Sequence, residues 1–470
     1  MNDRISQNDG RNTARPESLL VNVNKSSGPS ELKITDMRFA DITGAPMHCT
    51  LMKLMTNQGI EGFGEIRDGA SRTFALMIKS RILGENPCNV DKIFRRIKQF
   101  GNHGRQAGGV CGVEVALWDL AGKAYGAPVH QMLGGKFRDS VRMYCDTDAH
   151  NRPDGESMGR ALKARMAMGF TFLKMDLGID LLSGVPDTLS APEGILDVLQ
   201  PARNGIKSDP SEVLTDPLDT FIERNRRYDI HNISHPYTGI HVTEKGLDLL
   251  DGYVAAVREK IGYEIPLAID HVGHIPVEAC IKIARRLEKY NPAWLEDMLP
   301  WQLTDQYEQL SRATTVPICT GEDIYLRESF RPLLERRCVS MIHPDILSCG
   351  GILELKKIGD MAQDYGVAMS VHMAESPIAC LAAVHACAAT ENFTALEFHS
   401  VDHPWWNRIV TGLPNPIVRD GFIAVPDAPG LGIESLDDAV LAEHLHPSYP
   451  ELWAPTDDWN EEWSHDRTWS

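Results

Sequence analysis

The order of hydrophobic and polar positions changes near residue 140 and divides the chain into two parts. In the first part, residues 34–42 alternate between apolar and polar side chains, and residues 50–55 are mainly apolar. The turn signal Asn57-Gln58-Gly59 separates these runs from a third run at residues 61–65. Alternation with a period of two and short apolar runs between turn signals predict three β-strands.

A helical period follows these strands. Apolar positions recur at helical spacing from Arg72 to Phe100, a glycine-rich joint covers residues 101–112, and a strong helical pattern runs from Val113 to Ala124. We therefore predict a small α+β domain at residues 31–135. The polar residues 1–30 are predicted to be a disordered tail.

Beyond residue 140, short β-rich runs alternate with amphipathic helices. Eight strands, each followed by a crossover, are typical of a closed α/β barrel, so we predict a modified TIM barrel, (β/α)7-8, over residues 136–400. A doubly wound open sheet is the alternative, but no G-x-G-x-x-G motif follows the first strand. The predicted strands are Val141–Cys145, Phe172–Met175, Pro266–Ile269, Ala293–Leu295, Val316–Thr320, Val339–Ile342, Val367–Val371 and Thr394–Leu396.

One crossover is far longer than an ordinary connection. This insertion, at about residues 178–245, contains several prolines and the histidines His231, His235 and His241. The histidines lack the spacing of metal ligands. We interpret the insertion as a lid or an oligomer contact, and we expect a homo-oligomer.

Composition and charge narrow the classes of partner. The 470 residues are 43% hydrophobic and 24% charged, as in a globular protein with a sizeable core, and the formal net charge is −18. Such a charge argues against nucleic acid and anionic membranes as partners, although a pocket can still bind a small anion.

Cysteine usage and the absence of apolar segments bear on the compartment. The ten cysteines are scattered singly, without a C-x-x-C pair, which favours buried free thiols in a reducing compartment. No apolar leader and no membrane-spanning stretch is present in the sequence, so we expect a cytoplasmic protein.

The strongest chemical signal is the set of ionisable residues at the ends of the barrel strands. In a barrel of this type, side chains at the C-terminal strand ends meet at one mouth. Asp270, Glu296 and Glu322 follow one another at intervals of 26 residues, so we expect them at equal height on adjacent strands. Three such carboxylates repel one another unless a cation lies between them, and oxygen-only ligands favour Mg²⁺. The alternative is three solvated or salt-bridged rim carboxylates.

These residues, together with Asp345 and His372, resemble the enolase superfamily and, within it, the mandelate racemase subgroup. The resemblance covers residues 32 to 433 and includes Trp118-Asp119-Leu120-Ala121-Gly122-Lys123 and Pro429-Gly430-Leu431-Gly432. It implies that the α+β domain caps the barrel mouth. It also implies that a C-terminal segment, residues 401–470, returns to this capping domain.

The resemblance implies roles for further strand-end residues. His372 fits the general base, and Asp345, 27 residues earlier, would orient its imidazole. Lys174 matches the first lysine of the family's K-x-K motif, whereas Asp176 stands where racemases have the second lysine. Asp176 binds substrate hydroxyls, acts as a weak second acid or forms an ion pair with Lys174.

Two more residues carry candidate roles. Glu397 matches the acid that ends the eighth strand and would donate a hydrogen bond to the enediolate or orient the substrate. His274, four residues after Asp270, is either the acid that assists departure of a β-hydroxyl or a structural residue.

The resulting functional prediction is a lyase that acts on a small-molecule carboxylate. We expect Mg²⁺-dependent removal of the proton beside the carboxylate, followed by dehydration of an acid sugar, an aldonate or aldarate, to a 2-keto-3-deoxy acid. The alternatives are an epimerase, a racemase or a cycloisomerase with the same first step. A non-catalytic protein that binds sugar acids is disfavoured because it would not need the base.

Overall fold

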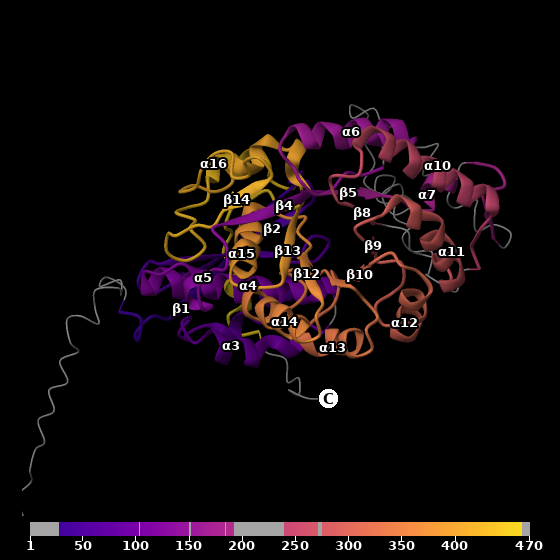
Figure 1. The fold of residues 1–470 in the computed structure, drawn as a ribbon. Coiled ribbons are helices and arrows are strands. Elements are labelled where there is room, and N and C mark those ends of the chain that lie inside the picture. Colours follow the sequence, from indigo (N-terminus) through magenta and orange to yellow (C-terminus); the bar gives the residue numbers. More distant parts are fainter. Residues whose placement is uncertain are drawn as a thin grey trace, which may run out of the picture.

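The computed structural model describes residues 28–102, 104–149, 152–183, 185–191, 239–270 and 275–462 (Figure 1). Most of the 178–245 insertion, with His231 and His235, lies outside these residues, as does the tail that precedes residue 28. His241 is described and lies in the short strand β7 (His241–Val242), which pairs with β6 (Leu189–Ser190). Among the described residues, no helix has both the length and the apolar character needed to cross a membrane.

The N-terminal part is an antiparallel sheet with helices packed on it. Its strands are β1 (Ile34–Ile42), β2 (Cys49–Thr56) and β3 (Glu61–Ile66), in the order β1-β2-β3. The helices that follow are α1 (Thr73–Leu76), α2 (Lys79–Ile82), α3 (Val90–Ile97) and α4 (Gly104–Tyr125).

Helix α4 begins earlier than the sequence pattern predicted, because residues 104–112 of the expected glycine-rich joint are its first turns. Glycines there are required by close packing. A Cβ added to Gly109 would lie 2.3 Å from the backbone of Phe74, and one added to Gly112 would lie 2.2 Å from the carbonyl oxygen of Glu65. This close packing requires glycine and offsets its low helix propensity. From the sequence alone, the same glycines suggested a break in the helix.

Eight parallel strands close into a barrel in the described part of the chain. They are β4 (Ser140–Cys145), β5 (Leu173–Asp176), β8 (Leu267–Asp270), β9 (Leu295–Glu296), β10 (Ile318–Thr320), β11 (Met341–Ile342), β12 (Ala368–Val371) and β13 (Phe393–Phe398). Pairing of β13 with β4 closes the ring, and β14 (Phe422–Ala424) adds to β4 in antiparallel orientation. The closed ring confirms the predicted barrel and excludes the doubly wound open sheet.

Helices cover the outside of the ring. They are α6 (Gly155–Ala167), α10 (Glu244–Ile261), α11 (Val277–Leu287), α12 (Thr304–Ala313), α13 (Arg327–Glu335), α14 (Ile352–Asp364) and α15 (Pro377–Ala388). Inside the ring, the aromatic and small side chains Tyr144, Phe172, Ala268, Trp294, Cys319 and Ala395 form a buried cluster. This cluster is the packed floor beneath the polar residues at the strand ends.

The N-terminal domain caps the barrel through buried carboxylates at helix N-termini. Glu65 in β3 accepts hydrogen bonds from the backbone N–H groups of Ser376 and Ala379 at the start of α15. Glu114 in α4 accepts bonds of 2.7 and 3.1 Å from the N–H groups of Ile352 and Leu353 at the start of α14. Helix N-termini have free N–H groups and positive partial charge, so they are natural partners for carboxylates.

Residues near the C-terminal end of the described chain run along strand β1. The backbone N–H of His446 donates to Asp41, that of Trp453 donates to Phe39, and the Thr456 hydroxyl donates to Met37. The short helix α16 (Asp438–Glu443) precedes this stretch. The predicted domain boundaries themselves stay predictions.

Candidate active site

The barrel places most of the sequence-predicted residues at one end of the ring. Lys174 and Asp176 lie in β5, and Asp270 and Glu296 are the last residues of β8 and β9. Glu322 and Asp345 lie shortly after the ends of β10 and β11, His372 directly follows β12, and Glu397 lies near the end of β13. His274 lies outside the described residues, so its role stays a prediction.

The expected equal height of the three carboxylates holds for two of them. In the register of the parallel sheet, Ile269 pairs with Leu295, which places Asp270 level with Glu296. Glu296 in turn pairs with Cys319, so Glu322 stands three residues further toward the mouth. The spacing of 26 residues was misleading here because the chain leaves the sheet after Thr320 and reaches Glu322 through Gly321, whose φ is 146°.

Lys174 joins three of the predicted carboxylates below the mouth. Its Nζ lies 2.6 Å from Asp270 Oδ2, 2.7 Å from Glu296 Oε1 and 2.7 Å from Glu397 Oε1. The lysine side chain is 1% exposed. Burial alone would lower the pKa of this lysine, but the three carboxylates outweigh it and raise its pKa well above the usual value, so it is a permanent positive charge.

Carboxylates crowd the mouth above Lys174. Glu296, Asp297 and Glu322 each place an oxygen within 4.8 Å of the others. Burial and the charge of Asp323, with a further contribution from Asp270, raise the pKa of Glu322 to about 7. Burial and the charges of Glu322, Glu296 and Asp270 raise the pKa of Asp297 well above its usual value.

This crowding fits a divalent cation. The mutual repulsion of the carboxylates is the interaction that a bound dication would replace by attraction. The donor atoms are all carboxylate oxygens, the ligands that hard cations prefer. The group of Glu296, Asp297 and Glu322 could therefore hold a metal ion. It contains two of the three predicted ligands and adds Asp297, whereas Asp270, the third, contacts Lys174.

His372 and Asp345 form the predicted pair on adjacent strands. His372 Nδ1 lies 2.7 Å from Asp345 Oδ2, and the backbone N–H of Leu347 donates a 2.6 Å bond to Asp345 Oδ1. The other ring nitrogen, Nε2, lies 3.2 Å from Glu322 Oε2. Asp345 thus holds one side of the imidazole, and the other side faces the carboxylate cluster.

Arg67 reaches this pair from the capping domain. Its guanidinium is 1% exposed, forms an ion pair with Asp345 and has Nη1 at 2.8 Å from His372 Nδ1. It also lies 3.4 Å from Glu375 and 3.5 Å from Glu322. Burial and the charge of Arg67 lower the pKa of His372 well below its usual value, so the imidazole is neutral.

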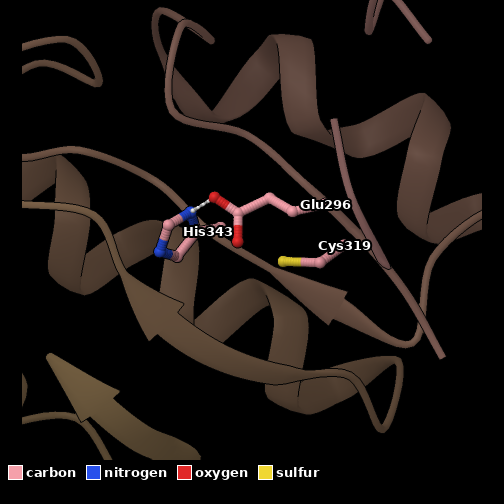
Figure 2. Close-up of side chains that lie close together, drawn as sticks. All are labelled: Glu296, Cys319 and His343. Carbon is pink, nitrogen blue, oxygen red and sulfur yellow. Dashed lines mark ion pairs between the residues drawn. The ribbon is translucent and has the colours of Figure 1, made fainter. Parts of the chain in front are cut away.

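A second histidine lies deeper in the barrel. His343 is fully buried, with Nδ1 at 3.0 Å from Glu296 Oε1, and it also contacts the hydroxyl of Tyr144. Figure 2 shows the thiol of Cys319 pointing toward the same Glu296 carboxylate. Burial opposes ionisation of Glu296, but the charges of His343 and Lys174 lower its pKa below the usual value. Glu296 is thus held as a carboxylate.

Asp176 takes part in the site less directly. It pairs with Asp270 in the register of β5 and β8, and its Oδ2 accepts a 3.4 Å bond from the backbone N–H of Ala149. These contacts test none of the three roles predicted for Asp176, which are substrate binding, a weak second acid and an ion pair with Lys174.

Sequence reasoning missed several residues of the site. His399 and Asp146 carried an available signal, because Asp146 directly follows the first barrel strand and His399 stands two positions after Glu397, on the same face of the strand. His343 likewise stands two positions before Asp345. No signal in the sequence pointed to Arg67, because this residue reaches the site from the capping domain and does not stand at the end of a barrel strand.

Comparison with known proteins identifies the family. Residues 29–134 match the mandelate racemase/muconate lactonizing enzyme N-terminal domain, and residues 240–439 match the enolase C-terminal domain-like family. A D-xylonate dehydratase of Haloferax volcanii is 28% identical over 89% of this chain and 90% of its own length. A D-galactonate dehydratase of Ralstonia pickettii is 26% identical over 85% of this chain and 91% of its own length.

Solved structures agree with these matches. A mandelate racemase/muconate lactonizing enzyme-like protein from Rubrobacter xylanophilus aligns with a TM-score of 0.71 and 29% identity, over 89% of this chain and 99% of that chain. An enolase superfamily member from Salmonella Typhimurium aligns with a TM-score of 0.69 and 26% identity, over 88% and 98% of the two chains. The predicted likeness to sugar-acid dehydratases and the predicted lyase class are confirmed. The chain belongs to the enolase superfamily, in its mandelate racemase/muconate lactonizing enzyme group.

Proposed function

We propose that this protein is a magnesium-dependent dehydratase of an acid sugar, an aldonate or aldarate, and forms a 2-keto-3-deoxy acid. The observation that carries the proposal is the position of His372, whose Nδ1 lies 2.7 Å from Asp345 and whose Nε2 lies 3.2 Å from Glu322 in the carboxylate cluster. A neutral imidazole beside a dication site is the arrangement needed to remove a proton next to a substrate carboxylate.

Glu296 and Glu322 would hold the Mg²⁺, with Asp297 as a further oxygen donor. Asp270, which is level with Glu296, would be the remaining ligand. When bound, the cation would stabilise the negative charge that develops on the substrate carboxylate as the α-proton leaves. Lys174 holds Asp270 and Glu296 in place and compensates their charge.

The remaining residues act on the proton and on the substrate. His372 accepts the α-proton at Nε2, while Asp345 fixes the Nδ1–H tautomer and stabilises the imidazolium that results. Glu397, level with His372 on the neighbouring strand, orients the substrate at the reacting carbon. Asp176 and His274 stay candidates for contacts with substrate hydroxyls.

Dehydration is favoured over racemisation by the residue at position 176. A racemase must return a proton to the opposite face, and the family's racemases have a lysine where this chain has Asp176. An ionised aspartate is a poor proton donor at neutral pH. The names of the two dehydratase relatives point the same way and suggest D-xylonate and D-galactonate as first substrates to test.

The test is proton NMR of each aldonate with the enzyme and MgCl₂ in deuterated water. We expect a 2-keto-3-deoxy product that carries deuterium at C3 and no C2 epimer, with no turnover after chelation of the metal. Accumulation of the C2 epimer without loss of water would replace the proposal by the epimerase alternative.

A further inference from the structure

A second histidine–aspartate pair lies beside the first one at the barrel mouth. His399 and Asp146 follow the adjacent strands β13 and β4, whose register pairs Phe398 with Cys145. His399 Nδ1 lies 3.4 Å from Asp146 Oδ2, and His399 Nε2 lies 3.2 Å from Glu397 Oε1. The rings of His399 and His372 are 5.8 Å apart.

We propose that His399 is the acid that protonates the departing β-hydroxyl, and that Asp146 positions it for that task. The proposal deepens the proposed function, since it rests on dehydration at this site. His274 was the candidate for this role from the sequence.

The surroundings of His399 suit an acid. Burial opposes its protonation, but the charges of Asp146 and Glu397 outweigh burial and raise the pKa of His399 to about 9. The side chain is 18% exposed, more than His372 at 7%. Among the described residues, His399 Nε2 has no hydrogen-bond partner of good geometry, although Glu397 is near, so its proton is available to a substrate hydroxyl.

The groups around His399 divide the work of elimination. Asp146 lies on the Nδ1 side and holds that proton, which leaves the Nε2 proton for transfer. Glu397 beside Nε2 is kept ionised, because the charges of Lys174 and His399 overcome the effect of burial and lower its pKa. An ionised Glu397 cannot supply the proton itself, so the acid at this end of the mouth is the histidine.

In the elimination, His372 accepts one proton and His399 donates one. His372 takes the proton from C2, and the electrons of that bond pass to the substrate carboxylate as an enediolate. These electrons then form the C2–C3 double bond while the C3–O bond breaks. The leaving oxygen takes the Nε2 proton of His399 and departs as water. The enol that remains becomes the 2-keto-3-deoxy acid, and the two histidines exchange the transferred protons with solvent.

The experiment separates proton removal from departure of the hydroxyl. The substrate is D-xylonate or D-galactonate, whichever the parent enzyme dehydrates, together with its 3-deoxy-3-fluoro analogue. Loss of HF gives the same 2-keto-3-deoxy acid as loss of water, but fluoride leaves without needing a proton. Product formation and fluoride release are measured for the parent, His399→Asn, Asp146→Asn and His372→Asn.

We expect His399→Asn to slow dehydration of the hydroxy acid by about 10²–10⁴-fold, the range for loss of a general acid. Its rate on the fluoro analogue should stay within about tenfold of the parent rate. In deuterated water the variant should still exchange the α-proton. Asp146→Asn should show the same selective defect to a smaller degree, and His372→Asn should lose both reactions.

Two controls make the result decisive. His403→Asn changes a histidine four positions further along, outside this cluster, and should behave as the parent. His274→Asn tests the rival acid. Equal losses on both substrates in His399→Asn, or the selective defect in His274→Asn instead, would overturn the proposal. A parent enzyme that forms neither product would instead refute the proposed dehydration.

Discussion

Glu296 is the residue on which the candidate metal site depends most. It is fully buried, and its carboxylate accepts hydrogen bonds of 2.7 Å from the Lys174 ammonium and 2.7 Å from the indole N–H of Trp294. Glu296→Gln keeps the shape but removes the charge. We expect affinity for Mn²⁺, used as a spectroscopic substitute for Mg²⁺, to fall at least ~100-fold, with a similar or larger loss of turnover.

Electron paramagnetic resonance of free Mn²⁺ measures the first quantity and product formation the second. Glu335→Gln, an exposed glutamate on α13, is the matched control and should change neither. Parent-like Mn²⁺ affinity in Glu296→Gln would remove this residue from the ligand set.

The base is tested separately from the metal. Asp345 lies 2.7 Å from His372 Nδ1, and neither residue is one of the proposed metal ligands. We expect His372→Asn to abolish exchange of the substrate α-proton with deuterated water, and Asp345→Asn to slow it by about 10²–10⁴-fold. Proton NMR follows the exchange. Exchange at the parent rate in both variants would place the base elsewhere, with Lys174 examined next.

At the level of single elements, the N-terminus of α14 is capped from the other domain. Burial raises the pKa of Glu114 to about 8. The hydrogen bonds from the backbone N–H groups of Leu353 and Ile352 lower it, but burial has the larger effect. An unfolded glutamate ionises near 4.5. Between these values the native state binds one proton more than the unfolded state, so the free energy of unfolding falls as pH rises, by up to about 1.4 kcal/mol per pH unit from this group.

Glutamine in place of Glu114 removes that dependence. Guanidinium unfolding of Glu114→Gln at pH 5, 6, 7 and 8 should show a smaller decline of the free energy of unfolding with pH than the parent. Glu391→Gln, an exposed glutamate before β13, should follow the parent. Parallel curves for Glu114→Gln and the parent would show that Glu114 does not take up the proton.

Elements with a clear hydrophobic period were predictable from sequence. All eight barrel strands appear close to their expected positions, because each is a short apolar run with an ionisable residue at its end. The first turns of α4 were not, because the close approach of Phe74 and Glu65 that requires glycine is a contact between distant segments. The predicted height of Glu322 was wrong for a related reason, because equal spacing along the chain does not determine where the chain leaves a sheet.

In the whole molecule, the candidate site is completed by the capping domain. Arg67, near the end of the capping sheet, contacts Asp345, His372 and Glu322 of the barrel. Glu65, two residues earlier, caps the helix that follows the strand of His372. The capping domain therefore supplies one charge of the site and supports a helix behind it, so the barrel alone does not contain the complete site.

The pairing of residues 444–456 with β1 has a consequence for biosynthesis. Thr456 bonds to Met37 across 419 positions of sequence, and the buried Lys79 also contacts Thr456. A ribosome makes one side of this contact early and the other very late. Until residues 444–456 are synthesised, the edge of β1 lacks their hydrogen bonds, and the Lys79 ammonium lacks the Thr456 hydroxyl. A nascent chain can thus form its strands in order, but the capping domain acquires these contacts only after residue 456 has been synthesised.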